Sequence, residues 1–154
     1  MNVFLADEQD EPLEPEPLRA LAVSVLEAEG IPEGTEMSLV LVGADDMQRY
    51  NERFMNRKGP TDVLAFPLEH LHPGQRPALQ PNGPPLNLGD VFICPQIVGA
   101  NAAAAGVPFP DELFLMVVHG ILHLLGYDHF EDDQAAAMEA REAVLLASVG
   151  RTRP

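Results

Sequence analysis

Residues 113–129, "LFLMVVHGILHLLGYDH", place three of the chain's five histidines inside and just after an apolar run. His119 and His123 stand four positions apart, and residues with this spacing share one face of an α-helix, with Cβ atoms about 5–6 Å apart. Gly126 is suited to end the helix, and a turn after it can bring His129 back towards the other two rings. The stretch therefore predicts an apolar helix that ends in a cluster of three imidazoles.

Three imidazole nitrogens are a donor set typical of a catalytic zinc ion, which keeps a fourth position open for water. We therefore predict that His119, His123 and His129 bind one divalent ion, and a tetrahedral nitrogen set suits zinc. The alternative is a core helix with incidental histidines, which a lone histidine would favour but this spacing does not. His70 and His72 lie in a proline-rich segment and are not expected to contribute.

The spacing also matches the long zinc-peptidase pattern H-E-x-x-H-x-x-G-x-x-H at every histidine and at the glycine. Gly120 stands where the glutamate base of a peptidase would be, so peptide hydrolysis lacks its usual proton acceptor. A substrate with a better leaving group, or a base from elsewhere, is favoured. Asp128, beside His129, is a candidate to support a metal ligand and equally a candidate to cap a turn. The candidate catalytic residues are thus His119 and Asp128.

The composition predicts a soluble, cytoplasmic protein. The chain has 154 residues, enough for one domain (1–154) with a core of its own. No apolar run is long enough to cross a bilayer, and the N-terminus lacks the pattern of a signal peptide. Cys94 is the sole cysteine, so no intrachain disulfide can form, and a thiolate-rich structural metal site is excluded.

The net charge of −15 argues against a nucleic-acid partner when it is taken alone. Its distribution weakens that argument, because residues 1–16 carry six acids and no bases. Four of the nine basic residues fall within ten positions, at Arg49, Arg53, Arg57 and Lys58. They predict either a local basic patch on an acidic protein or an ordinary solvated helix face. Both interpretations stay open at this point.

Periodicity and punctuation residues predict an α+β domain with four strands and about five helices. A loop over residues 68–88 holds five prolines and two glycines, and its length indicates either mobility or function. The last four residues, 151–154, are expected to fray. The predicted strands span residues 2–7, 37–43, 61–67 and 88–95, and the predicted helices span residues 17–30, 44–55, 95–105, 110–126 and 131–150.

Three blocks of this chain resemble the YbeY endoribonucleases, also called rRNA maturation factors. They are "PTDVLAFP" at 60–67, "LGDVFICPQIV" at 88–98 and "HGILHLLGYDHFEDDQAAAM" at 119–138, and they occur in the order of that family. The last block is the most specific of the three. The N-terminal third resembles the family only in its expected elements.

This resemblance implies a cytoplasmic, single-domain α+β protein with a small mixed sheet and a zincin-like helix that carries the metal. It implies zinc held by His119, His123 and His129, and metal-dependent cleavage of single-stranded RNA. It further implies a role in maturing the 3′ end of small-subunit ribosomal RNA and in ribosome quality control. Its implied partners are therefore single-stranded ribosomal RNA and the small ribosomal subunit, with no membrane.

The chain departs from the family at Met55, where many members have an arginine that is considered important for handling RNA. Arg53, Arg57 and Lys58 are the candidate substrate-binding residues in its place. Ala65 and Cys94 stand where serine is common, and a small residue on a strand makes such changes mild; Cys94 is expected in the core.

Three functions remain as hypotheses. The first is a zinc endoribonuclease, and the second is a metal-stabilised ribosome-assembly or RNA-binding factor with little catalysis. The third is a metallopeptidase, which Gly120 disfavours.

Overall fold

The computed structural model describes all 154 residues, and four strands form one mixed sheet in it. The strands lie in the order β1-β2-β4-β3, with β1, β2 and β4 parallel and β3 antiparallel to β4. The α+β prediction with four strands and five helices is confirmed. The strands are β1 (Asn2–Glu8), β2 (Thr35–Val42), β3 (Val63–Pro67) and β4 (Leu86–Ile93).

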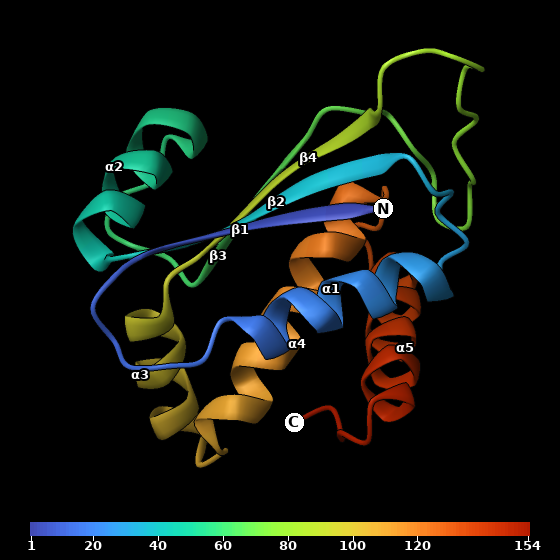
Figure 1. Ribbon diagram of the computed structural model, residues 1–154. Helices are drawn as coiled ribbons and strands as arrows, with labels where there is room; N and C mark the ends of the chain where they lie inside the picture. Colours follow the sequence, from blue (N-terminus) through green and yellow to red (C-terminus); the bar gives the residue numbers. More distant parts are fainter.

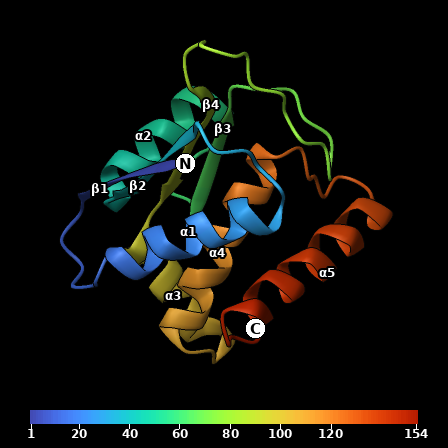
Figure 2. The ribbon, with the colours of Figure 1, turned by 45° about the vertical axis from the view of Figure 1, so that its right-hand side comes forward.

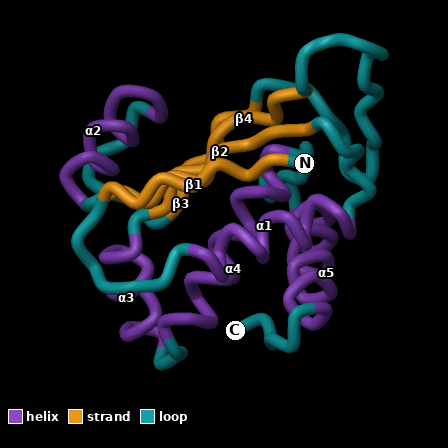
Figure 3. Tube along the Cα trace, viewed as in Figure 1, coloured by secondary structure: helices purple, strands orange, loops and turns teal.

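Four of the five helices lie on one side of the sheet and α2 lies on the other (Figures 1 and 3). Successive side chains of β2 point to opposite faces of the sheet, so its apolar residues can pack against helices on both sides. Leu39 and Leu41 join the core under α1 and α4, whereas Val40 and Val42 pack with α2. The helices are α1 (Glu16–Ala28), α2 (Ala44–Met55), α3 (Pro95–Ala105), α4 (Phe109–Leu124) and α5 (Asp132–Ser148).

Helix α4 is the centre of the larger core and contacts α1, α3, α5, β3 and β4. Its apolar residues are buried around most of its circumference, as expected for a helix with neighbours on several sides. Gly120 faces the sheet, and a Cβ atom placed there would lie 2.5 Å from Cγ1 of Val91 and 3.2 Å from Cγ2 of Val63. Glycine therefore allows this close approach of α4 to β3 and β4.

The opposite face of the sheet is covered by α2 through a smaller cluster around Val42, Met47, Leu64 and Cys94. Cys94 is fully buried, as predicted. Helix α2 ends at Met55 because Asn56 adopts a left-handed conformation, with φ of 53°. Arg53 and Arg57 stand four positions apart but do not share a helix face, since Arg57 lies beyond the end of the helix.

The proline-rich loop extends from residue 68 to residue 85, because β4 begins at Leu86, two residues before the predicted strand. Figure 2 shows this loop descending beside the segment that joins α4 to α5. There the carbonyl oxygen of Leu71 would lie only 2.0 Å from a Cβ atom on Gly126, whose φ is +98°. Gly126 thus combines a left-handed turn with a close backbone contact, and both requirements exclude larger residues.

The last four residues fold back onto the helices, so the prediction that they fray is wrong. Arg151 forms an ion pair of 2.9 Å with Asp111, and its guanidinium lies 3.9 Å from the ring centroid of Phe114. Arg153 reaches the buried carboxylate of Glu142. Ion pairing in the folded chain overrides the usual tendency of a polar terminus to stay free. No helix of the chain has both the length and the apolar composition that crossing a membrane requires.

Candidate metal centre

The three histidines of residues 113–129 lie close together in space, as their spacing predicts. Candidate ligand atoms of His119, His123 and His129 all lie within 4.8 Å of one another. The last turns of α4 present His119 and His123 side by side, with ring centroids 4.5 Å apart, and the turn at Gly126 returns His129 to within 4.9 Å of the His123 ring centroid. His70 and His72 take no part in the cluster, as expected.

Hydrogen bonds fix where two of the rings carry their protons. Nδ1 of His119 lies 2.8 Å from Oε2 of Glu142, and Nδ1 of His123 lies 2.9 Å from the carbonyl oxygen of Tyr127. Each partner is an acceptor, so each Nδ1 donates, and a neutral imidazole has no second proton to give. Both Nε2 atoms are then acceptors, and they face each other at 3.0 Å. Two lone pairs held this close favour a cation between them.

This donor set fits a tetrahedral zinc ion. Bonds of about 2.0–2.1 Å to one such ion separate its nitrogen ligands by about 3.3–3.4 Å, close to the spacing of the two Nε2 atoms. Neutral nitrogen donors without a thiolate are typical of catalytic sites that keep a position open. His129, the third candidate ligand, is exposed. His119, His123 and His129 would therefore hold the ion, with one side of it open to solvent.

Burial keeps the middle ligand neutral. Desolvation, and secondarily the neighbouring rings of His119 and His129, lower the pKa of His123 to about 4. The ring is therefore uncharged at neutral pH, which leaves its Nε2 lone pair free to bind a metal. The contact from Nδ1 to the carbonyl oxygen of Tyr127 fixes the tautomer that exposes this lone pair.

The carboxylate that supports a ligand is Glu142, which the sequence analysis missed. It is only 1% exposed and lies on α5, thirteen positions after His129. A signal for it was present in the sequence, because Glu142 shares the spacing of the buried face of α5, with Met138, Leu145 and Leu146. A carboxylate at such a position requires a polar partner, and here the partners are His119 and Arg153.

Asp128 makes the turn-capping contact: its Oδ1 accepts a hydrogen bond of 2.9 Å from the backbone N–H of His129. It holds the segment that carries the third histidine, and it also borders the groove beside the histidines. Its catalytic role stays a prediction. Asp62 borders both this groove and a second hollow, and the two also share His119 and His129.

A groove of about 530 Å³ runs across the three histidines. It is lined by Met55 at the end of α2, by Arg57 in the α2–β3 connection, and by Phe130, which is 83% exposed, in the α4–α5 connection. Of the predicted basic residues, Arg57 alone borders this groove. Arg53 lines a separate hollow on α2 and lies over the Phe54 ring, and Lys58 is exposed outside the groove.

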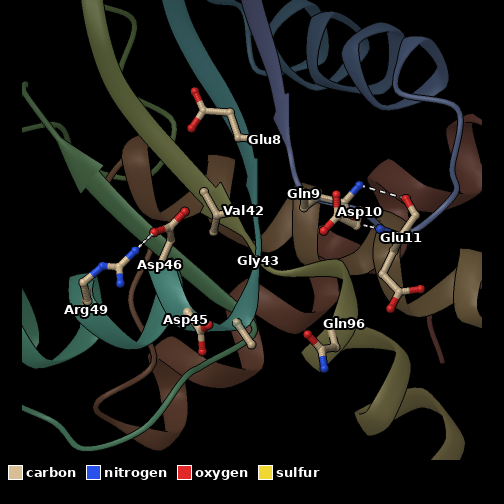
Figure 4. Close-up of a pocket in the computed structure, with 11 residues that line it drawn as sticks. Glu8, Gln9, Asp10, Glu11, Val42, Gly43, Asp45, Asp46, Arg49 and Gln96 are labelled. Atoms are coloured by element: carbon tan, nitrogen blue, oxygen red, sulfur yellow. Dashed lines mark hydrogen bonds and ion pairs between the residues drawn. The ribbon is translucent and has the colours of Figure 1, made fainter.

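Another hollow, of about 550 Å³, lies at the ends of β1 and β2 and the start of α2 (Figure 4). Five carboxylates line it, together with one arginine, Arg49, which pairs with Asp46. A polyanion would be repelled there. The histidine groove is therefore the better candidate for a functional site. The carboxylates belong to Glu8, Asp10, Glu11, Asp45 and Asp46.

Comparison with known proteins gives the family of this chain. The family model described as "Endoribonuclease YbeY" matches residues 4–150. An endoribonuclease YbeY of Salinispora tropica is 40% identical over 157 residues, covering 99% of each chain, and one of Thermobifida fusca is 41% identical over 152 residues, covering 99% of this chain and 96% of the relative. The solution structure of TM1509 from Thermotoga maritima is similar with a TM-score of 0.60 and 26% identity, over 96% of this chain and 91% of that one. The resemblance seen in the three sequence blocks thus extends over nearly the whole chain, which belongs to the endoribonuclease YbeY family.

Proposed function

We propose that this chain is a zinc-dependent endoribonuclease that cleaves single-stranded RNA at the three-histidine centre. The observation that carries the proposal is the pair of facing Nε2 atoms of His119 and His123, with His129 beside them, at the floor of an open groove. The names of the relatives support RNA as the substrate. Lewis-acid activation of water or of a phosphoryl oxygen is the chemistry that bound zinc supplies.

The chain's own residues give the groove two features suited to a single strand. The exposed guanidinium of Arg57 can pair with a phosphate, and the exposed ring of Phe130 offers an apolar face on which an unpaired base can stack. Arg53 and Lys58 remain proposed substrate contacts, for the part of the RNA strand that extends beyond the groove. On a protein of net charge −15, these few cations set where a polyanion can approach.

His119 and Asp128 are the residues that we propose for catalysis. His119, which lines the groove, would hold the metal, and its ring is hydrogen-bonded to Glu142. Asp128 borders the same groove beside His129, with one carboxylate oxygen engaged by the backbone. A carboxylate there can accept or return a proton during cleavage of a phosphodiester.

In the cell, we propose that this activity matures the 3′ end of small-subunit ribosomal RNA and contributes to ribosome quality control in the cytoplasm. The substrate is then the RNA of the small ribosomal subunit, and residues 1–154 act as a single domain. Membership of the endoribonuclease YbeY family supports this proposal.

A second candidate is a metal-stabilised RNA-binding factor for ribosome assembly with little catalysis of its own. Met55 favours it, because an uncharged side chain lines the groove where many members of the family have an arginine. A metallopeptidase is disfavoured by packing as well as by sequence. A glutamate at position 120 would collide with Val91 and Val63, so the usual peptidase base has no room there.

The test is cleavage of a labelled single-stranded RNA by the metal-depleted protein, before and after one equivalent of zinc is added, with an unfolded protein as a parallel substrate. The endoribonuclease proposal predicts RNA cleavage that needs zinc and no proteolysis. RNA binding that weakens with salt but gives no cleavage with zinc present would support the assembly factor instead. Zinc-dependent digestion of the unfolded protein would identify a peptidase.

A further inference from the structure

The final residues of the chain lie beside Glu142, the carboxylate that supports the metal centre. After α5 ends at Ser148, Gly150 adopts φ of +77° and the backbone N–H of Arg151 donates to the carbonyl oxygen of Leu146 at 2.9 Å. This turn reverses the chain, so that the residues after it run back along α5. Arg153 consequently lies beside Glu142, eleven positions earlier in the sequence.

Arg151 anchors this reversed segment. Its Nη1 atom lies 2.9 Å from Oδ1 of Asp111 in the first turn of α4, and its guanidinium covers the ring of Phe114. The segment is thus attached to the beginning of the same helix whose end carries the histidines. Its position is set by contacts that do not involve the metal centre.

Arg153 and His119 divide the two oxygens of one buried carboxylate. Nε of Arg153 donates to Oε1 of Glu142 at 3.1 Å, and Nδ1 of His119 donates to Oε2 at 2.8 Å. With both oxygens engaged, the carboxylate plane cannot rotate freely about its last bond. The direction from Oε2 to the His119 ring is therefore fixed, and so is the direction in which Nε2 of that ring points.

We propose that Arg153 is a positioning residue of the metal centre, which acts on His119 through Glu142. The inference rests on the proposed function, since it assigns a role in holding the same metal ion. Arg153 also borders a second hollow, together with Glu139 and Glu142. This hollow shares His119 and His129 with the RNA groove, but Arg153 does not line the groove itself. Removal of a carboxylate that orients a metal-bound histidine typically weakens metal binding by about 10–100-fold.

A purely structural ion pair would give a different result, and the chain offers a matched control. Arg141 lies on α5 next to Glu142, its side chain is 30% exposed like that of Arg153, and its Nε pairs with Glu29 at 2.9 Å. That pair contacts no histidine. The variant Arg141→Ala therefore removes an equivalent arginine pair from α5 without changing the support of His119.

The experiment is a zinc titration of the full-length, metal-depleted protein against a chromogenic chelator, with the thermal midpoint of the metal-free form as a second readout. Parent, Arg153→Ala, Glu142→Gln, the double variant and Arg141→Ala are compared. We expect Arg153→Ala to weaken zinc binding by roughly tenfold and Glu142→Gln by about 10–100-fold. In the Glu142→Gln background, Arg153→Ala should add less than about a factor of two, since residues that act through one another are not additive.

Arg141→Ala should leave the zinc affinity of the parent unchanged, whatever it does to the thermal midpoint. An Arg153→Ala variant that binds zinc as tightly as the parent would overturn the inference while leaving the metal centre intact. The same holds if its loss of affinity adds in full to that of Glu142→Gln, or is matched by Arg141→Ala. A parent protein that binds no zinc would overturn the metal centre of the proposed function, and this inference with it.

Discussion

The Nε2 atoms of His119 and His123 lie 3.0 Å apart, although both rings direct their only proton away from each other. Two acceptor nitrogens at this spacing favour a cation between them.

Removal of the metal should lower thermal stability without unfolding the protein. An ion that binds only the folded state adds about 4 kcal/mol when its concentration is 1,000 times Kd, which corresponds to roughly 8–16 °C in a chain of this size. The large core around α4 lies mostly away from the histidines, so the domain should stay folded. Calorimetry with and without a chelator measures the shift. Complete unfolding on chelation would instead identify a structural metal site of the zinc-finger kind.

Gly120→Ala should destabilise the protein by about 1–3 kcal/mol, because the new Cβ atom would press on Val91 in a well-packed core. Denaturant unfolding of the metal-free protein measures the loss. Gly43→Ala is the control, since nothing lies within 4 Å of a Cβ atom there. That variant should cost no more than about 0.5–1 kcal/mol, because alanine is a poorer helix N-cap residue than glycine. Equal losses for the two variants would contradict the packing described for α4.

Acidification should destabilise the metal-free protein through His123. Its folded pKa of about 4 lies below the value of about 6.5 expected in the unfolded chain, so the unfolded state binds more protons between these values. Stability from this group is therefore present above about pH 6.5 and is lost as the pH falls towards 4. Denaturant midpoints measured over this range, as a difference between the parent and His123→Gln, isolate the contribution. A difference that does not change with pH would show that the ring titrates normally.

Arg57→Glu should weaken cleavage of single-stranded RNA and lower the salt dependence of binding, because Arg57 borders the histidine groove. Losing one phosphate contact reduces the slope of log affinity against log salt by about 0.7 for a single strand. Arg53→Glu makes the same charge change outside the groove and should have a smaller effect on cleavage. Zinc content should be unchanged in both variants. Equal RNA cleavage by the Arg57→Glu variant and the parent, at every salt concentration, would exclude Arg57 as a contact for the RNA.

The histidine cluster could be predicted from sequence because its geometry is local. A separation of four positions on a helix and a glycine turn place all three rings within one segment of eleven residues. The alternation of apolar residues in the strands was equally local, and it predicted the strands to within about two residues at most ends. The sheet order β1-β2-β4-β3 was beyond such reasoning, because it depends on contacts between distant segments.

The supporting residues were missed for the same physical reason. Glu142 lies on another helix, in a stretch rich in acids, and only its packing against α4 distinguishes it from a solvated carboxylate. The sequence around Arg153 predicts a free terminus, and only the fold brings this residue to its partner, Glu142. The separation of Arg53 from Arg57 depends on one residue, Asn56, whose left-handed conformation ends α2 between them.

The most direct test of the central claim is a titration of zinc into the metal-depleted protein, with the metal content and the rate of RNA cleavage measured on the same samples. The account predicts that the cleavage rate rises with bound zinc and saturates at one equivalent per chain. His123→Ala should retain no stoichiometric zinc and should not cleave, whereas His72→Ala should behave like the parent, because its side chain lies outside the cluster. Stoichiometric zinc in the His123→Ala variant, or full cleavage by the metal-depleted parent, would contradict the claim that these histidines hold a catalytic metal.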